Sequence, residues 1–66
     1  MHLLTTLSNA NRTAKIFESY DGTYTVEYFM NNKLLQKTHH MDEYLAEEVA
    51  DDFIAEAGPN PKLLKD

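Results

Sequence analysis

The clearest pattern of hydrophobic and polar positions lies near the end of the chain, in DEYLAEEVADDFIAEAG, residues 42–58. Its apolar residues recur at intervals of three and four, which places them on one face of an α-helix. Asp42 is suited to cap the first turn, and Gly58, followed by Pro59 and Pro61, is suited to end the helix. The pattern therefore predicts one amphipathic helix over Asp42–Gly58, with an apolar face made of Leu45, Ala46, Val49, Ala50, Phe53, Ile54 and Ala57.

Before the helix, runs rich in β-branched and aromatic residues alternate with short polar turn sequences. Turn signals at residues 20–23 (YDGT) and 30–33 (MNNK) divide this region into three antiparallel strands, Thr13–Ser19, Thr23–Met30 and Leu34–His40. The first turn can close with two residues, or as a type I turn with Gly22 in a bulge. We favour the bulged turn because it places Lys15 opposite Glu27, where the two charges attract.

The segment His2–Leu7 has the composition of a fourth strand, which would turn within residues 8–11. A short helix is the competing interpretation. The predicted fold class is α+β, an antiparallel β-meander of three to four strands with one C-terminal amphipathic helix packed on one face. Residues 1–58 are expected to form this single small domain, and residues 59–66 a C-terminal tail.

Adjacent pairs of apolar residues on the predicted strands bear on assembly. The pairs are Ile16–Phe17, Tyr28–Phe29 and Leu34–Leu35. Neighbours on a strand point to opposite faces, so both sheet faces carry bulky apolar groups, and one helix can cover only one face. A chain of 66 residues without cysteine has a small core and no disulfide, so a second subunit is the remaining source of stability. The sequence predicts a homodimer or higher oligomer whose interface includes Phe17, Phe29 and Leu34.

The net charge of −5 is concentrated in the predicted helix. Residues 42–57 contain seven acidic residues and no basic one. Clustered acids disfavour direct binding of nucleic acid, which needs clustered Lys and Arg. They can instead attract a basic protein, or imitate the charge of a nucleic acid; the simpler alternative is a solvated helix face. The candidate partner-binding residues are Glu47, Glu48, Asp51, Asp52 and Glu56.

The four tyrosines divide by their positions. Tyr24 and Tyr28 alternate with polar residues on the more apolar face of a predicted strand, so they are expected in the core or at its edge. Tyr20, in a turn, and Tyr44, on the flank of the helix, are expected to be exposed. Exposed tyrosines favour protein contacts.

The sequence contains few motifs typical of catalysis, metal binding or phosphate binding. Residues 39–42 (HHMD) are the one group with metal-ligand residue types, but adjacent histidines leave a strand on opposite faces, and Asp42 is better used as the helix cap. Ser8 and Ser19 lack a recognisable nucleophile motif, and the two glycines do not form a phosphate-binding loop. We therefore expect neither an enzyme nor a cofactor or metal site. The first residues lack the features of a signal peptide and no apolar run is long enough to span a bilayer, so a cytoplasmic protein is expected.

Three segments carry a resemblance to a known group of proteins: LLTTLSNANRTAKIF (3–17), DGTYTVEYF (21–29) and YLAEEVADDFIAE (44–56). Together they resemble small uncharacterised proteins of marine cyanophages and ocean metagenomes. The strand that starts with DG-x-Y-x-V and the Ala/Glu-rich helix are also similar to antitoxin subunits of toxin–antitoxin pairs. These resemblances imply no activity for any residue. They imply a phage-encoded accessory protein, or an antitoxin-like inhibitor, as alternatives to an interaction module.

Overall fold

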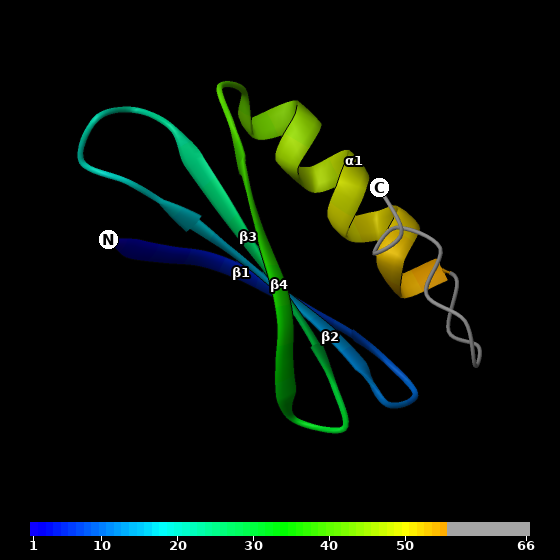
Figure 1. Ribbon diagram of the computed structural model, residues 1–66. Helices are drawn as coiled ribbons and strands as arrows, with labels where there is room; N and C mark the ends of the chain where they lie inside the picture. The colour runs from blue at the N-terminus through cyan, green and yellow to red at the C-terminus, as the bar shows by residue number, and fades with distance from the viewer. Residues whose placement is uncertain (56–66) are drawn as a thin grey trace.

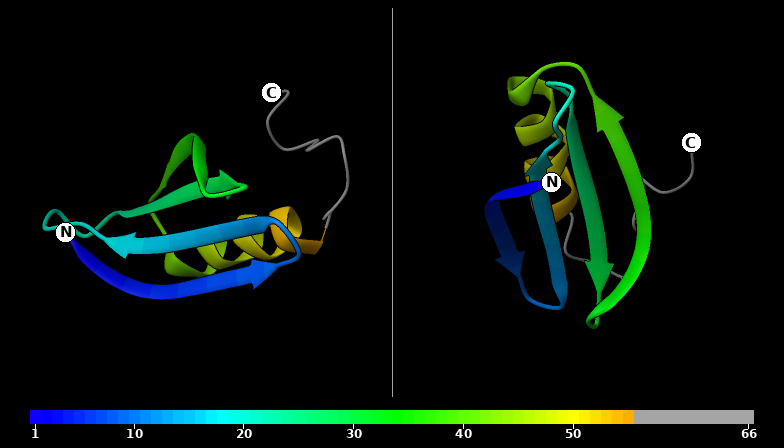
Figure 2. Two further views of the ribbon diagram at one scale, coloured as in Figure 1. Left: turned by 90° about the horizontal axis from the view of Figure 1, so that it is seen from below. Right: turned by 90° about the vertical axis from the view of Figure 1, so that its left-hand side faces the viewer.

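The computed structural model describes residues 1–55, which form four antiparallel strands followed by one helix. The elements are β1 (His2–Asn9), β2 (Arg12–Glu18), β3 (Tyr24–Met30), β4 (Lys33–His40) and α1 (Glu43–Ala55). The strands are hydrogen-bonded in the order β1-β2-β3-β4, and α1 lies against one side of the twisted sheet (Figure 1; Figure 2). The predicted α+β meander is confirmed, and the N-terminal segment is a strand rather than a helix. The expected helix end at Gly58 and the tail from Pro59 lie outside the described residues.

The turn between β2 and β3 has the bulged form that the sequence favours. The Gly22 amide donates to the Ser19 carbonyl at 3.2 Å, and the Ser19 amide donates to the Thr23 carbonyl at 2.9 Å. Gly22 has a φ of +87°, which glycine adopts without steric strain. The resulting register pairs Lys15 with Glu27, as predicted.

The other two hairpins close with two-residue turns. Asn31 and Asn32, between β3 and β4, have φ values of +53° and +67°, the pattern of a type I′ turn, for which Asn is well suited. Between β1 and β2, Ala10 has a φ of +56° whereas Asn11 is not in the positive region, the pattern of a type II′ turn. Glycine is the usual residue at that first position. An alanine there is strained because its Cβ approaches the following carbonyl oxygen.

Both edge strands contain a β-bulge at a pair of leucines. The extra residue is Leu4 in β1 and Leu35 in β4. Bulges locally disrupt the hydrogen-bond ladder and twist the edge away from other sheets, which discourages edge-to-edge pairing. The bulge in β4 also interrupts the alternation of side chains, so Gln36, and not Leu35, lies opposite Tyr28. The expectation that Leu34 and Leu35 point to opposite faces by simple alternation therefore fails at this position.

The core lies between α1 and the side of the sheet that the helix covers. The rings of Tyr28 and Phe53 pack edge to face, with centroids 5.1 Å apart and an interplanar angle of 60°. Small side chains at Ala46 and Ala50 allow α1 to lie close to the strands. Leu45 corrects the prediction: it is 45% exposed, because it lies about 100° around the helix from Ala46. The buried apolar residues are Ala14, Ile16, Val26, Tyr28, Ala46, Ala50 and Phe53.

A buried arginine holds the last turn of α1 against the first hairpin. Arg12 is 0% exposed; its Nη1 donates to the Phe53 carbonyl oxygen at 2.9 Å, and its Cζ lies 4.9 Å from the centre of the Phe53 ring. Asn9 Nδ2 donates to the Ile54 carbonyl oxygen at 2.8 Å. The last turn of α1 has no basic residue of its own. Arg12 therefore supplies the positive charge that the negative end of the helix dipole favours.

The first turn of α1 is capped as predicted. Asp42 Oδ1 accepts a hydrogen bond from the Tyr44 amide at 2.8 Å, and the Asp42 carbonyl accepts from the Ala46 amide at 3.1 Å. The carboxylate thus satisfies one of the free amides at the positive end of the helix.

Two substitutions test the strained and unstrained turns. Ala10→Gly should raise the free energy of unfolding by about 0.5–1 kcal/mol, because glycine relieves the positive φ. Gly22→Ala should lower it by roughly 1–2 kcal/mol through backbone strain alone, since an added Cβ meets no atom within 4 Å. Chemical denaturation measures both. A destabilised Ala10→Gly variant would contradict the turn geometry.

Replacing Arg12 tests the connection between the helix and the first hairpin. Arg12→Met keeps much of the buried volume but leaves the Phe53 carbonyl without this donor and removes the charge from the ring. We expect a loss of about 2–3 kcal/mol in the free energy of unfolding. The matched control is Lys33→Met, an exposed cation at the start of β4, which should change stability by less than about 0.5 kcal/mol. Equal effects of the two substitutions would show that Arg12 has no special role.

Candidate functional site

The side of the sheet away from α1 is the largest feature that the helix leaves uncovered. Residues paired across the strands share a face, so the register arranges this side as three rows. From β1 to β4, the first row is Leu3, Phe17, Thr25 and His39; the second is Thr6, Lys15, Glu27 and Lys37; the third is Ser8, Thr13, Phe29 and Leu34. We call these twelve residues the open sheet face.

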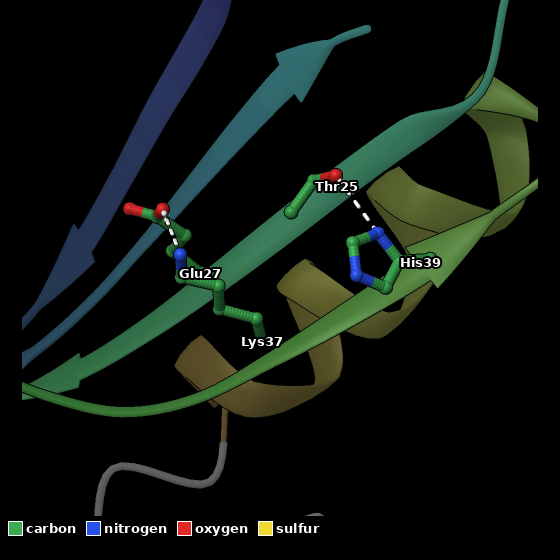
Figure 3. A network of polar contacts seen from close by, with 4 residues as sticks. All are labelled: Thr25, Glu27, Lys37 and His39. Atoms are coloured by element: carbon green, nitrogen blue, oxygen red, sulfur yellow. Dashed lines mark hydrogen bonds and ion pairs between the residues drawn. The ribbon is translucent and has the colours of Figure 1, made fainter. Parts of the chain in front are cut away.

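The middle row of the open sheet face is charged. Lys37 Nζ lies 3.6 Å from Glu27 Oε2, and both side chains stand on the sheet on the side opposite α1 (Figure 3). The Glu27 side chain is 18% exposed and that of Lys37 is 49% exposed. Lys15 Nζ lies 5.0 Å from the centre of the Phe29 ring, so its charge covers part of that aromatic surface. Two cations and one anion thus cross the centre of the face.

The first row contains a buried polar pair. Thr25 is 1% exposed although it faces away from the helix, and its Oγ1 lies 3.0 Å from His39 Nδ1 (Figure 3). The strand pairing sets Thr25 between Phe17 and His39, whose larger side chains flank it on the two neighbouring strands. These larger neighbours leave the threonine almost no surface of its own.

The predicted interface residues share the open sheet face. Phe17 and Phe29 are partly buried within the single chain, and Leu34 is 48% exposed. Leu3, which the sequence does not single out, is opposite Phe17 and is 45% exposed. Phe17 and Phe29 point away from their buried neighbours Ile16 and Tyr28, as the alternation predicts.

The acidic residues of α1 form a second surface, on the opposite side of the molecule. Four of the candidate partner-binding residues are exposed, and the fifth, Glu56, lies outside the described residues. The four are Glu47, Glu48, Asp51 and Asp52, which we call the acidic helix surface. Within residues 1–55 no ion pair reaches them. Tyr44 and Leu45 beside them are 69% and 45% exposed, so this surface also offers an aromatic and an aliphatic contact.

The two adjacent histidines do not come together. His39 lies on the open sheet face with Thr25, whereas His40 lies on the helix side, where its Nε2 is 2.8 Å from Thr38 Oγ1. Thr38 Oγ1 is in turn 2.8 Å from the Tyr28 hydroxyl. Among residues 1–55, no group of three or more His, Asp or Glu side chains is arranged to hold a metal ion.

A shallow hollow lies at the turn end of the sheet, lined by Asp21, Thr23, His39, His40 and Met41. The Asp21 carboxylate is already used there: Oδ1 accepts from the Thr23 amide at 3.1 Å and from the Thr23 hydroxyl at 2.7 Å. These hydrogen bonds hold the pKa of Asp21 below its usual value. The carboxylate therefore stays ionised and stabilises its own turn.

Sequence reasoning missed two buried polar residues, Arg12 and Thr25. From the sequence alone, Arg12 has the appearance of an ordinary surface cation. The one sequence feature that indicates its burial is its position two residues before Ala14 and four before Ile16, which face the core from the same strand. Thr25 reads as the solvent-facing partner of Val26 in an alternating strand. Its burial arises from the neighbouring strands, which the local sequence does not reveal.

Searches against protein-family models, curated proteins and solved structures find no match to this chain. In the part of the chain that the structure describes, α1 is neither long nor apolar enough to cross a bilayer, and it is the one helix there. The physical properties of the two surfaces are therefore the basis for a functional proposal.

Titration of His40 should contribute to the pH dependence of stability. Burial, and secondarily the charge of His39, hold the pKa of His40 below its ordinary value near 6.5. The unfolded chain then binds a proton more readily than the folded chain, so stability falls as pH drops below about 6.5 towards the folded pKa. In His40→Gln this part of the decrease should be absent. Urea denaturation between pH 7.5 and pH 5 measures it.

The control for this measurement is His2→Gln, which removes an exposed histidine at the start of β1. It should retain the loss of stability that the His40→Gln variant lacks. Identical pH profiles for wild type and His40→Gln would show that burial of His40 has no thermodynamic effect.

Proposed function

We propose that this chain is a non-enzymatic interaction module, oligomeric through the open sheet face, that presents the acidic helix surface to a basic protein partner. The observation that supports the proposal is that acidic side chains of α1 are exposed and form no ion pair within the described residues. Glu47, Glu48, Asp51 and Asp52 are exposed, and no cation within residues 1–55 neutralises them. A helix that needed only solubility would gain stability from Lys at some of these positions, because like charges three or four residues apart repel.

The chemistry of the acidic helix surface favours a basic protein over other ligands. Carboxylates repel the phosphates of nucleic acids and attract Lys and Arg side chains. Their combined field would speed the encounter with a basic surface, and this effect weakens as salt screens the charges. Tyr44 and Leu45 add apolar contact area beside the charges, and tyrosine is enriched at protein interfaces.

The experiment is affinity capture from a lysate of the native host with the full chain as bait, at low and high salt. Asp51→Lys combined with Asp52→Lys should reduce recovery of a basic partner by about tenfold or more at low salt. The fold should be unaffected, because cations near the end of a helix interact favourably with its dipole. Circular dichroism checks the fold of the variant.

The control compares one charge reversal on the acidic helix surface with one outside it. Glu18→Lys changes an exposed acid at the end of β2, so it alters the net charge as much as Asp51→Lys does. Capture should fall with Asp51→Lys and stay near the wild-type value with Glu18→Lys. Unchanged recovery by the double reversal would refute a role for the acidic helix surface and favour a purely structural or accessory subunit.

A further inference from the structure

We propose that the open sheet face binds a second copy of this chain face to face, about a two-fold axis that runs parallel to the strands between β2 and β3. This inference specifies the association contained in the proposed function and rests on it. It can fail while partner binding stands, because a dimer built in another way, or a monomer, could still present the acidic helix surface.

The charged row selects the axis. A rotation of 180° about a line parallel to the strands places β2 of one copy over β3 of the other and keeps each row over the same row. In the middle row, Lys15 then lies over Glu27 of the second copy, and Glu27 lies over Lys15 of the second copy. Lys37 falls over the small Thr6 at the rim, where a charge can remain hydrated. The two central charges of each copy are thus compensated by the other copy.

The third row is complementary in size about the same axis. In the third row Phe29 lies over Thr13 of the second copy. In the first row Phe17 lies over the position of Thr25, which is 1% exposed, so the ring faces the larger side chains that flank this threonine. The Phe29 ring therefore meets a small side chain, which is the condition for two packed sheets to interdigitate. The exposed side chains of Leu3 and Leu34 extend this apolar contact along the outer strands.

The alternative two-fold axis, which runs across the strands, is disfavoured by charge. It would place β2 over β2 and reverse the order of the rows, so that Lys15, Glu27 and Lys37 each lie over themselves. Three like-charge contacts at the centre of an interface oppose association. Both axes place one phenylalanine ring over Thr13, so the charges alone distinguish them.

The edges of the sheet point to the same conclusion. Bulges at Leu4 and Leu35 interrupt the outer strands, so association by extending the sheet across either edge is disfavoured. Face-to-face packing avoids the edges and leaves α1 on the outside of each copy. The two acidic helix surfaces then lie on opposite outer sides, away from each other and open to partners.

The experiment begins with the mass of the full chain in solution, measured by light scattering from micromolar to near-millimolar concentration. Wild type should be a dimer. Lys15→Glu alone and Glu27→Lys alone should each weaken self-association by roughly a hundredfold or more, because each creates two like-charge contacts across the axis. An equimolar mixture of the two variants should form a mixed dimer, detected by native mass spectrometry.

Mixing separates contacts between copies from contacts within one copy. Lys15 and Glu27 are also neighbours in the same sheet, so each reversal introduces repulsion within its own chain. That repulsion is the same before and after mixing, so only charges facing across the interface can account for a mixed dimer. Lys33→Glu is the matched control: it changes the same charge at an exposed position opposite Met30, on the helix side of the sheet, and should leave dimerisation unchanged.

A second variant keeps the test decisive if the single reversals fold poorly. The combination of Lys15→Glu with Glu27→Lys preserves an opposite-charge pair within the chain. It should associate with itself and not with wild type. A monomeric wild type, single reversals that dimerise as wild type does, or free exchange between the combined variant and wild type would each overturn the arrangement. Unchanged capture of a basic partner in those cases would leave partner binding by the acidic helix surface intact, whereas a monomeric wild type would also contradict the oligomeric part of the proposed function.

Discussion

The contact of Arg12 with Phe53 determines how the helix sits on the sheet. A helix as acidic as α1, with no base in its last turn, gains from a positive charge at its negative end, and Arg12 at the start of β2 provides one. The same guanidinium lies over the Phe53 ring, and that ring packs against Tyr28 in the third strand. One buried cation therefore joins the first hairpin, the end of the helix and the centre of the core.

Once the helix is held on this side, the opposite side of the sheet is left without cover in residues 1–55. Its residues are not simply apolar. A charged row crosses between two rows that each hold one phenylalanine beside one threonine. Lys15 covers part of the Phe29 ring, and Lys37 forms an ion pair with Glu27. A surface of this kind can remain in water as a single chain and still match a copy of itself. Glu47, Glu48, Asp51 and Asp52, in contrast, are exposed, and no ion pair within residues 1–55 reaches them.

Much of the architecture could be predicted because it rests on local chemistry. The intervals of three and four in α1, the Asp42 cap, and the Asn and Gly residues of two turns each restrict the backbone within a few residues. The turn between β1 and β2 was harder to predict, because Ala10 adopts a conformation that alanine disfavours and that the surrounding hairpin imposes. Leu45 and Leu35 departed from expectation, since the width of the helix–sheet contact and the bulge are not visible in periodicity.

Turn chemistry and residue spacing were enough to predict the three strands that precede the helix, and the acids of the helix could be located from spacing alone. They also favoured, without settling, the register that pairs Lys15 with Glu27. The packing of the folded chain, by comparison, buries Arg12, covers Thr25 and gives His39 and His40 separate partners. Each of those outcomes depends on side chains from strands or helices distant in the chain. A local pattern shows which way a residue points, whereas its burial and its partners are set by the elements that pack around it.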